Sequence, residues 1–162
     1  MTSIEVISLL TLVAQCFLVY FARRTIRENE IANRKRAIVD VVMNHRNDKE
    51  LMAIFRDLYQ LRESNKKLSE LCNQDEQFLK KVLYALDTME FIAVGIRLSA
   101  FDEDVYKQLQ CSKVIKTWDA ASGLVMELRR EKKCPTIYQD LENLANKWSA
   151  CPIVELKKQM YK

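Results

Sequence analysis

Glycine and proline are almost missing from this chain. Its 162 residues include two of each, and the first 94 residues contain neither. Average usage would supply roughly eight or more of each. Sheets depend on turns that use these residues, so their scarcity favours long helices. It also leaves no glycine-rich phosphate loop, because neither G-x-G-x-x-G nor G-x-x-x-x-G-K-[ST] occurs.

The N-terminal segment from Ile4 to Ala22 would be apolar on every face of a helix. It reads IEVISLLTLVAQCFLVYFA, and no charge follows Glu5 until Arg23. At 1.5 Å per residue it would extend about 28 Å, close to the ~30 Å hydrocarbon core of a bilayer. A signal peptide would have Lys or Arg before the apolar run and a cleavage site after it, and the chain shows neither. We therefore predict a transmembrane anchor over residues 1–22.

The charges beside this anchor predict its orientation. Only Glu5 lies at its N-terminal end, whereas residues 23–36 contain six basic and two acidic side chains. Positive residues stay on the cytoplasmic side, so we expect a single-pass protein of the inner (cytoplasmic) membrane, with its N-terminus outside and its C-terminal domain cytoplasmic. A basic juxtamembrane helix should cover residues 23–46. Its side chains expected at the membrane surface, next to anionic lipid, are Arg23, Arg24, Arg27, Arg34, Lys35 and Arg36.

A polar seam in the anchor suggests self-association. Ser8, Thr11 and Gln15 would lie within about 60° of one another around a helix. Lipid offers no hydrogen-bond partners, so such side chains can bond between neighbouring helices. Alternatively, Ser8 and Thr11 bond their own backbone and Gln15 reaches water. We expect a homo-oligomer.

The rest of the chain predicts a cytoplasmic helical domain over residues 47–150, followed by a basic tail over 151–162. The predicted fold class is all-α, with an N-terminal transmembrane helix followed by a compact bundle of five or six helices. Apolar residues at helical spacing occur in the segments 51–61, 78–96, 114–128 and 137–148. The residues expected to begin helices are Asp48, Asp75, Asp102, Ser112 and Pro135.

The charge of this cytoplasmic domain argues against generic nucleic-acid binding. The whole chain has a net charge of +4, and residues 23–36 alone also sum to +4. Everything else is therefore neutral overall and lacks the broad positive field that such binding uses. The lipid bilayer remains the partner that explains the basic residues.

Few residues are arranged for catalysis or metal binding. His45 is the sole histidine, and the five cysteines lie at least 17 residues apart without a C-x-x-C pair. Zinc sites need clustered ligands, and a serine nucleophile needs a base within reach. We therefore predict no enzyme, no catalytic residue, no metal and no cofactor. The cysteines are expected to be reduced thiols in a reducing compartment.

Two charged groups have structural interpretations that we favour over chemical ones. Asp87 and Glu90 could serve acid–base chemistry, but Glu90 lies two helical turns before Arg97, so we expect those two to form an ion pair. The second group could bind phosphate, although a solvated helix end explains it better; it comprises Arg129, Arg130, Lys132 and Lys133.

Three runs carry a resemblance to a known family: MEFIAVGIRLSAFDEDVYKQL, KVIKTWDAASGLVMELRR and TIYQDLENLANKW. With the run from Arg34 to Ala37, they resemble a bacterial family of membrane-anchored helical proteins classed as a domain of unknown function. The similarity covers roughly residues 20–150, and its most specific parts are residues 90–97 and Trp118. The resemblance implies the fold and the membrane topology, and it transfers no activity.

A second similarity lies in architecture alone. The layout resembles bacterial antiviral effectors that join a membrane segment to a small domain sensing a nucleotide second messenger, including cyclic oligoadenylates of type III CRISPR systems. Oligomers suit that task because symmetry gathers groups from several subunits around one ligand. The ligand-binding residues that we would assign first are Lys113, Lys116, Trp118 and Arg97. Solvent contacts, a core tryptophan and an internal ion pair are the competing explanations.

Together these features predict a membrane-tethered, non-enzymatic helical sensor or interaction module that self-associates, with a role in bacterial antiviral defence or envelope stress. The alternative is a membrane effector gated by a cyclic oligonucleotide, which perturbs the membrane when the nucleotide binds.

Overall fold

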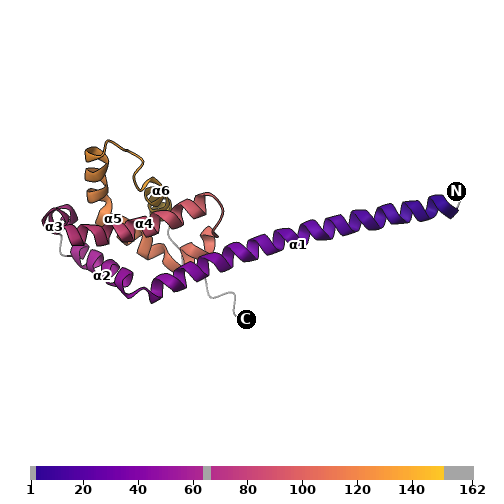
Figure 1. Cartoon of the computed structure of the whole chain (residues 1–162), viewed down its shortest axis with the longest axis horizontal. Coiled ribbons are helices and arrows are strands. Elements are labelled where there is room, and N and C mark those ends of the chain that lie inside the picture. Colours follow the sequence, from indigo (N-terminus) through magenta and orange to yellow (C-terminus); the bar gives the residue numbers. More distant parts are fainter. Residues whose placement is uncertain (1–2, 64–66, 152–162) are drawn as a thin grey trace.

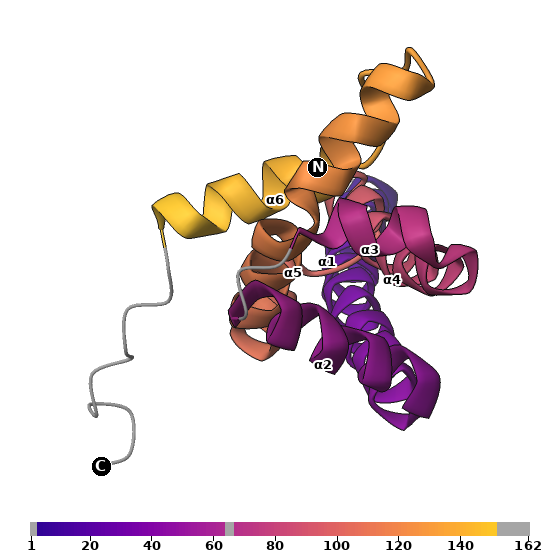
Figure 2. The same cartoon turned by 90° about the vertical axis from the view of Figure 1, so that its left-hand side faces the viewer.

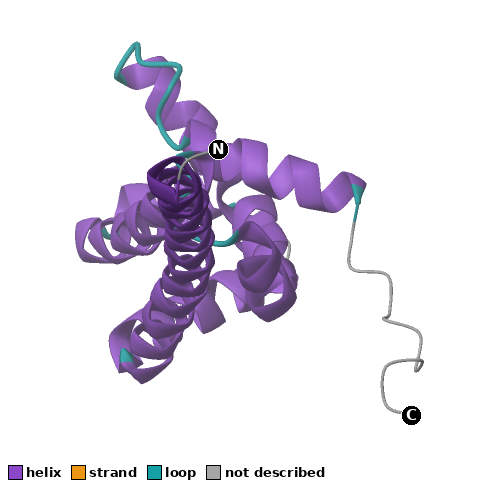
Figure 3. Ribbon diagram, turned by 90° about the vertical axis from the view of Figure 1, so that its right-hand side faces the viewer, coloured by secondary structure: helices purple, strands orange, loops and turns teal. Residues whose placement is uncertain are grey.

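Six helices make up the computed structural model, which describes residues 3–63 and 67–151; the side chains of residues 3–9 and of Glu63 lie outside the description. The predicted all-α fold is confirmed, since no strand occurs in these two ranges (Figure 3). The helices are α1 (Ser3–Asn47), α2 (Lys49–Glu63), α3 (Leu68–Gln74), α4 (Glu76–Arg97), α5 (Glu103–Glu131) and α6 (Gln139–Ala150).

The first helix is an arm that extends far beyond the others (Figure 1). α1 has 45 residues, which corresponds to a length of about 68 Å. Every side chain described between Leu10 and Arg36 is exposed, and burial begins at Ile38 and Val42. α1 packs against α5 and α2, and the two buried residues place this packing in its C-terminal part. One continuous helix therefore joins the predicted anchor to the bundle.

The described residues do not support the predicted membrane anchor. In the part of the chain that the structure describes, no helix combines the length and the apolarity needed to cross a membrane. Residues 4–9 of the predicted span, including Ser8 of the polar seam, have side chains outside the description.

Asp48 forms the corner between α1 and α2. Its Oδ1 accepts the Leu51 amide at 2.9 Å, as predicted for a helix cap. Its Oδ2 accepts the Tyr84 hydroxyl of α4 at 3.0 Å. These hydrogen bonds lower the pKa of Asp48 below its usual value. The corner thus ends the arm, starts α2 and holds both to α4.

α4 contributes a broad buried face to the bundle. The side chain of Asp75 caps its N-terminus by accepting the Gln77 and Phe78 amides at 2.9 and 3.0 Å. α4 packs against α2, α3 and α6, and α4 and α5 separate α2 from α6 (Figure 2). The buried residues of α4 are Val82, Ala85, Leu86, Met89, Ile92, Ala93, Gly95 and Ile96.

The predicted helix start at Ser112 is wrong. The side chain of Asp102 caps α5 by accepting the Val105 amide at 2.9 Å, and the helix then continues to Glu131. Ser112 is exposed, while Cys111 and Val114 on either side are buried. A serine whose hydroxyl faces solvent need not interrupt a helix, and the apolar face runs on unbroken through it.

The final helix begins later than predicted. Pro135 lies in a turn region instead of starting α6, whose first residue is Gln139. Lys133 and Tyr138 in this connection have φ of 50° and 54°. The inward residues of α6 match the prediction and are Leu141, Leu144, Ala145 and Trp148. The predicted tail lies outside the described residues from 152 onward.

The two glycines should respond oppositely to alanine. A Cβ at Gly95 would overlap the Phe101 ring, whereas a Cβ at Gly123 meets nothing within 4 Å. Gly95→Ala should lower the free energy of unfolding by about 1–3 kcal/mol through overpacking. Gly123→Ala should raise it by about 0.5–1 kcal/mol, because alanine favours the helix. Urea unfolding of the two variants measures both effects, and equal changes would contradict the predicted packing at Gly95.

Candidate functional site

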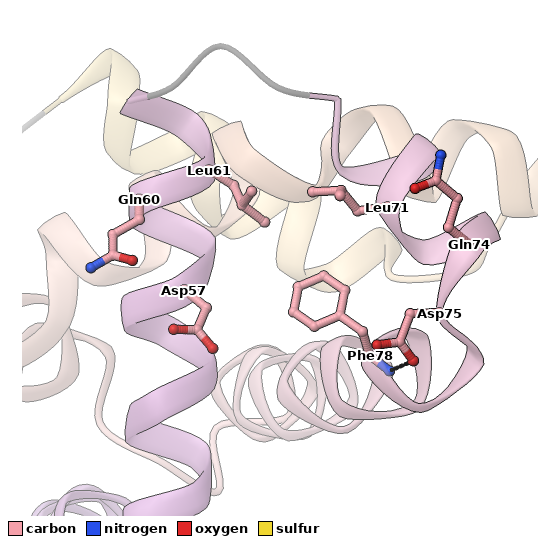
Figure 4. Close-up of a pocket in the computed structure, with 7 residues that line it drawn as sticks. All are labelled: Asp57, Gln60, Leu61, Leu71, Gln74, Asp75 and Phe78. Carbon is pink, nitrogen blue, oxygen red and sulfur yellow. Dashed lines mark hydrogen bonds between the residues drawn. The ribbon is translucent and has the colours of Figure 1, made fainter.

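A groove opens between α2, α3 and the start of α4 (Figure 4). These parts of the helices lie at the end of the bundle opposite the arm (Figure 1). It has a volume of about 510 Å³. Leu61, Leu71 and Phe78 form its apolar floor and point toward one another from three helices (Figure 4). The polar residues that line it are Asp57, Gln60, Gln74 and Asp75.

The chemistry of the groove is that of a binding surface. Its lining contains no histidine, cysteine, lysine or arginine. Asp75 is occupied as the cap of α4, which leaves Asp57 as the second carboxylate. An apolar floor with a few polar groups around it is the usual composition of a small-ligand site. The groove can accommodate an apolar group flanked by hydrogen-bond donors, and it offers no acid–base pair.

The carboxylates of α4 hold the start of α6. Glu90 accepts the Leu141 amide at 2.7 Å and the Asp140 amide at 3.2 Å, and Asp87 accepts the Tyr138 hydroxyl at 2.8 Å. α6 has no side-chain cap of its own, so Glu90 satisfies its otherwise unpaired amides. Burial raises the pKa of Glu90, while the two amide bonds oppose this rise. Both members of the candidate acid–base pair therefore have structural partners.

The predicted ion pair between Glu90 and Arg97 is wrong. Arg97 instead contacts Asp140 of α6, with 2.8 Å between Nε and Oδ1. Asp140 is largely buried, whereas Arg97 is mostly exposed. The tertiary fold pairs Arg97 with Asp140, which lies 43 residues further along the chain. The predicted partner, Glu90, lies two helical turns before Arg97. Arg97, one of the predicted ligand-binding residues, is thus engaged in an ion pair within the chain.

Lys113 and Lys116 lie on the face of α5 that meets α2. The Lys113 ammonium is 4.4 Å from the centre of the Phe55 ring, and the Lys116 ammonium is 5.8 Å from that of Tyr59. Such cation–π contacts are favourable, and more so when partly desolvated. The structure brings these two predicted ligand-binding residues together on one surface.

Trp118 and Arg97 do not join that surface within one chain. Trp118 is 7% exposed and belongs to the apolar core. Arg97 lies at the end of α4 and contacts α6, which packs on the other side of α4 and α5 from α2. The four predicted residues therefore divide into a pair of surface cations, a core residue and an ion-paired residue.

The basic cluster at the end of α5 is partly structural. Arg129 is 13% exposed; its Nη1 contacts Glu142 at 2.8 Å and its Nε donates to the Ile137 carbonyl at 2.9 Å. It therefore fixes the connection between α5 and α6. Arg130, Lys132 and Lys133 are left as cations of the helix end, in accordance with the structural interpretation.

The predicted membrane-surface residues occupy the exposed arm. All six lie between Arg23 and Arg36, where every side chain of α1 is exposed. Arg24 pairs with Glu28 one turn on, with 2.8 Å between Nε and Oε1. Both side chains are more than half exposed, so this pair adds little stability, and the arm keeps its positive charge.

Among the described residues, no three His, Cys, Asp or Glu side chains gather as metal ligands. The five cysteines are free thiols. Burial raises the pKa of Cys72 to about 11, which makes it unreactive. Hydrogen bonds with Thr136 lower the pKa of Cys134.

One protein-family profile matches this chain, over residues 5–148. The family is described as Domain of unknown function (DUF4760). The chain belongs to the DUF4760 family. The predicted membership in a family of unknown function is thereby confirmed. Among curated proteins and solved structures, none matches the chain significantly. The DUF4760 match spans the arm and all five helices of the bundle.

Sequence reasoning did not find the groove or the attachment of α6. The groove combines side chains from three helices, and one of them, α3, lies between the predicted apolar segments 51–61 and 78–96. Asp87 and Glu90 were recognised as a pair, but their partners lie about 50 residues further on. The one available signal was the missing cap before α6, since Tyr138 is a poor N-cap residue.

Removing Glu90 should loosen α6. Glu90→Ala leaves two partly buried amides unpaired, which should lower the free energy of unfolding by about 1–2 kcal/mol. Hydrogen exchange should quicken first in residues 139–150. The matched control is Glu76→Ala, because Glu76 forms only an exposed pair with Lys80; its effect should stay below about 0.5 kcal/mol. Similar losses for both variants would show that Glu90 does not hold α6.

Proposed function

We propose that this DUF4760 protein is a membrane-tethered, non-enzymatic helical sensor or interaction module of the bacterial inner membrane. One observation carries the proposal: the arm presents large apolar side chains to its surroundings. Between Leu10 and Phe21, eight such residues are exposed, from 44% for Val13 to 70% for Leu18. An apolar surface of this extent is unfavourable in water and marks contact with lipid or another protein.

Charge favours lipid as the surroundings of this segment. The exposed apolar residues give way at Arg23 to the basic stretch 23–36. Cations at this position suit the cytoplasmic face of a bilayer. The basic stretch is helical and exposed, so it would set the bundle about 20 Å from the membrane surface if the arm stands upright.

The bundle is then the part that meets cytoplasmic ligands. Asp87 and Glu90 hold α6, and the groove lining offers no nucleophile with a base. These features support recognition more than catalysis. A role in antiviral defence or envelope stress stays a prediction from the layout of the chain, as does gating by a cyclic oligonucleotide.

Membrane attachment is testable by extraction. The full-length protein should stay with vesicles washed in alkaline carbonate. The variant combining Leu12→Arg and Phe17→Arg should appear in the supernatant, because each arginine costs about 2.5–3.5 kcal/mol in the hydrocarbon core. Met126→Arg is the matched control, since Met126 is an exposed apolar residue of the bundle; it should stay in the pellet. Wild-type protein in the supernatant would disprove the tether.

Self-association through the anchor predicts a second result. Gln15→Leu removes the amide that could bond between helices, so the oligomer fraction seen by cross-linking in membranes should fall. An interhelical hydrogen bond of this kind contributes about 0.6–2 kcal/mol, which corresponds to a several-fold weaker association. Leu18→Ile changes an apolar residue for another and serves as the control. If the cross-linked oligomer fraction of Gln15→Leu equalled that of the wild type, the polar seam would not be part of the interface.

A further inference from the structure

The groove between α2, α3 and α4 is acidic, although the protein as a whole is basic. Two carboxylates line it, those of Asp57 and Asp75, and none of its described lining residues is a lysine, arginine or histidine. The whole chain has a net charge of +4. A concave surface lined by charges of one sign attracts ligands of the opposite sign. The groove therefore favours a cation.

Asp57 is the carboxylate that can receive this cation. Its side chain is partly buried and points from α2 across the groove towards the Phe78 ring (Figure 4). Among the described residues, its carboxylate forms neither an ion pair nor a hydrogen bond. A charge that is partly withdrawn from water gains from an opposite charge that compensates it.

The basic side chains near the groove in sequence do not neutralise it. Three of them pair with other carboxylates, and these pairs are Arg62 with Asp119, Lys67 with Glu70, and Lys80 with Glu76. Arg56 and Lys81 are exposed and do not line the groove. The negative charge of the groove is therefore available to a ligand.

The floor of the groove selects for an apolar body beside the charge. Leu61, Leu71 and Phe78 are each only partly buried and point toward one another, so a ligand can cover them further. The Phe78 ring also offers a face to a cation. The volume of about 510 Å³ lies within the range of small-molecule sites. The size and the lining thus fit a small molecule that is apolar at one end and positively charged at the other.

We propose that the groove binds a small soluble organic cation in which an apolar body carries a primary ammonium group. The body packs on the apolar floor, and the ammonium donates charge-assisted hydrogen bonds to Asp57. The side-chain carbonyls of Gln60 and Gln74 provide further acceptors at the rim. The inference rests on the proposed function as a sensor and names the class of ligand that the sensor detects. The same charge disfavours a phosphate-bearing ligand in this groove.

Occupancy should stabilise α3 against the bundle. The lining residues come from α2, α3 and α4, so the ligand contacts all three helices at once. α3 has only seven residues, and no side chain caps its N-terminus. A ligand that binds best when α3 is packed must, by linkage, favour that packed arrangement.

The 2-phenylethylammonium ion is a suitable probe for the full-length protein in lipid nanodiscs. Ligand-observed NMR, with empty nanodiscs as the reference for partitioning into lipid, should show binding to the wild type. Asp57→Asn keeps the shape of the side chain and should bind the ion about tenfold more weakly. The matched control is Asp104→Asn, which removes an exposed carboxylate at the start of α5 and should bind like the wild type. Absent binding, or equal weakening in both variants, would overturn the site.

Uncharged and anionic probes of similar shape test the role of charge. The alcohol 2-phenylethanol should bind the wild type about tenfold more weakly than the ammonium ion does, and Asp57→Asn should not change its affinity. Equal affinities for the ammonium ion and the alcohol, or tighter binding of 3-phenylpropanoate, would overturn the preference for a cation. A hexalysine peptide that bound more tightly than the small ammonium ion would overturn the small-molecule assignment in favour of a protein partner.

Hydrogen exchange tests the effect on α3. The phenylethylammonium ion should slow amide exchange in residues 68–74 of the wild type and have no such effect in Asp57→Asn at the same concentration. Binding without slower exchange would overturn the stabilisation of α3.

The same preparations separate this inference from the tether. Protein that carbonate extracts, yet binds the ammonium ion with the expected variant pattern, keeps the groove as a site and loses the tether. Protein that stays in the membrane and does not bind the ion loses the site alone.

Discussion

The structure depends on the corner at Asp48. A helix of 45 residues has no internal reason to stop, because its sequence contains neither glycine nor proline. Asp48 ends it by capping the next helix through Leu51 and by accepting the hydroxyl of Tyr84 from α4. Two hydrogen bonds thus convert an extended arm into the edge of a bundle. Without this corner, α2 could not return along α4 and α5.

Carboxylates replace the missing helix breakers throughout the bundle. Asp75 and Asp102 begin α4 and α5 by accepting amides of the first turn. Glu90 does the same for α6 from a neighbouring helix. The chain has four more basic than acidic side chains, and Lys113 packs its ammonium over the Phe55 ring instead of forming one of the ion pairs of the structure.

The arm is attached to the bundle by only a short stretch near its C-terminal end. Its long segment is exposed and apolar toward the N-terminus, then basic, and it touches the bundle only near Ile38 and Val42. A small contact between two rigid parts concentrates any change of angle in a few residues. The helices that line the groove meet at the end of the bundle opposite the arm. The groove is therefore separated both from the residues that attach the arm and from the proposed membrane surface.

The sequence by itself determined the local features. Capping joins residues two or three positions apart, so Asp48 could be recognised from composition and spacing, and apolar periodicity identified the inward faces. The error at Ser112 arose because a residue that caps well is also tolerated inside a helix when its hydroxyl faces water. Only the tertiary structure decided which distant groups meet: Glu90 with the Leu141 amide, and Lys113 with Phe55. Such contacts depend on how whole helices pack, and helical spacing along the chain carries no information about the neighbour that a polar side chain will find.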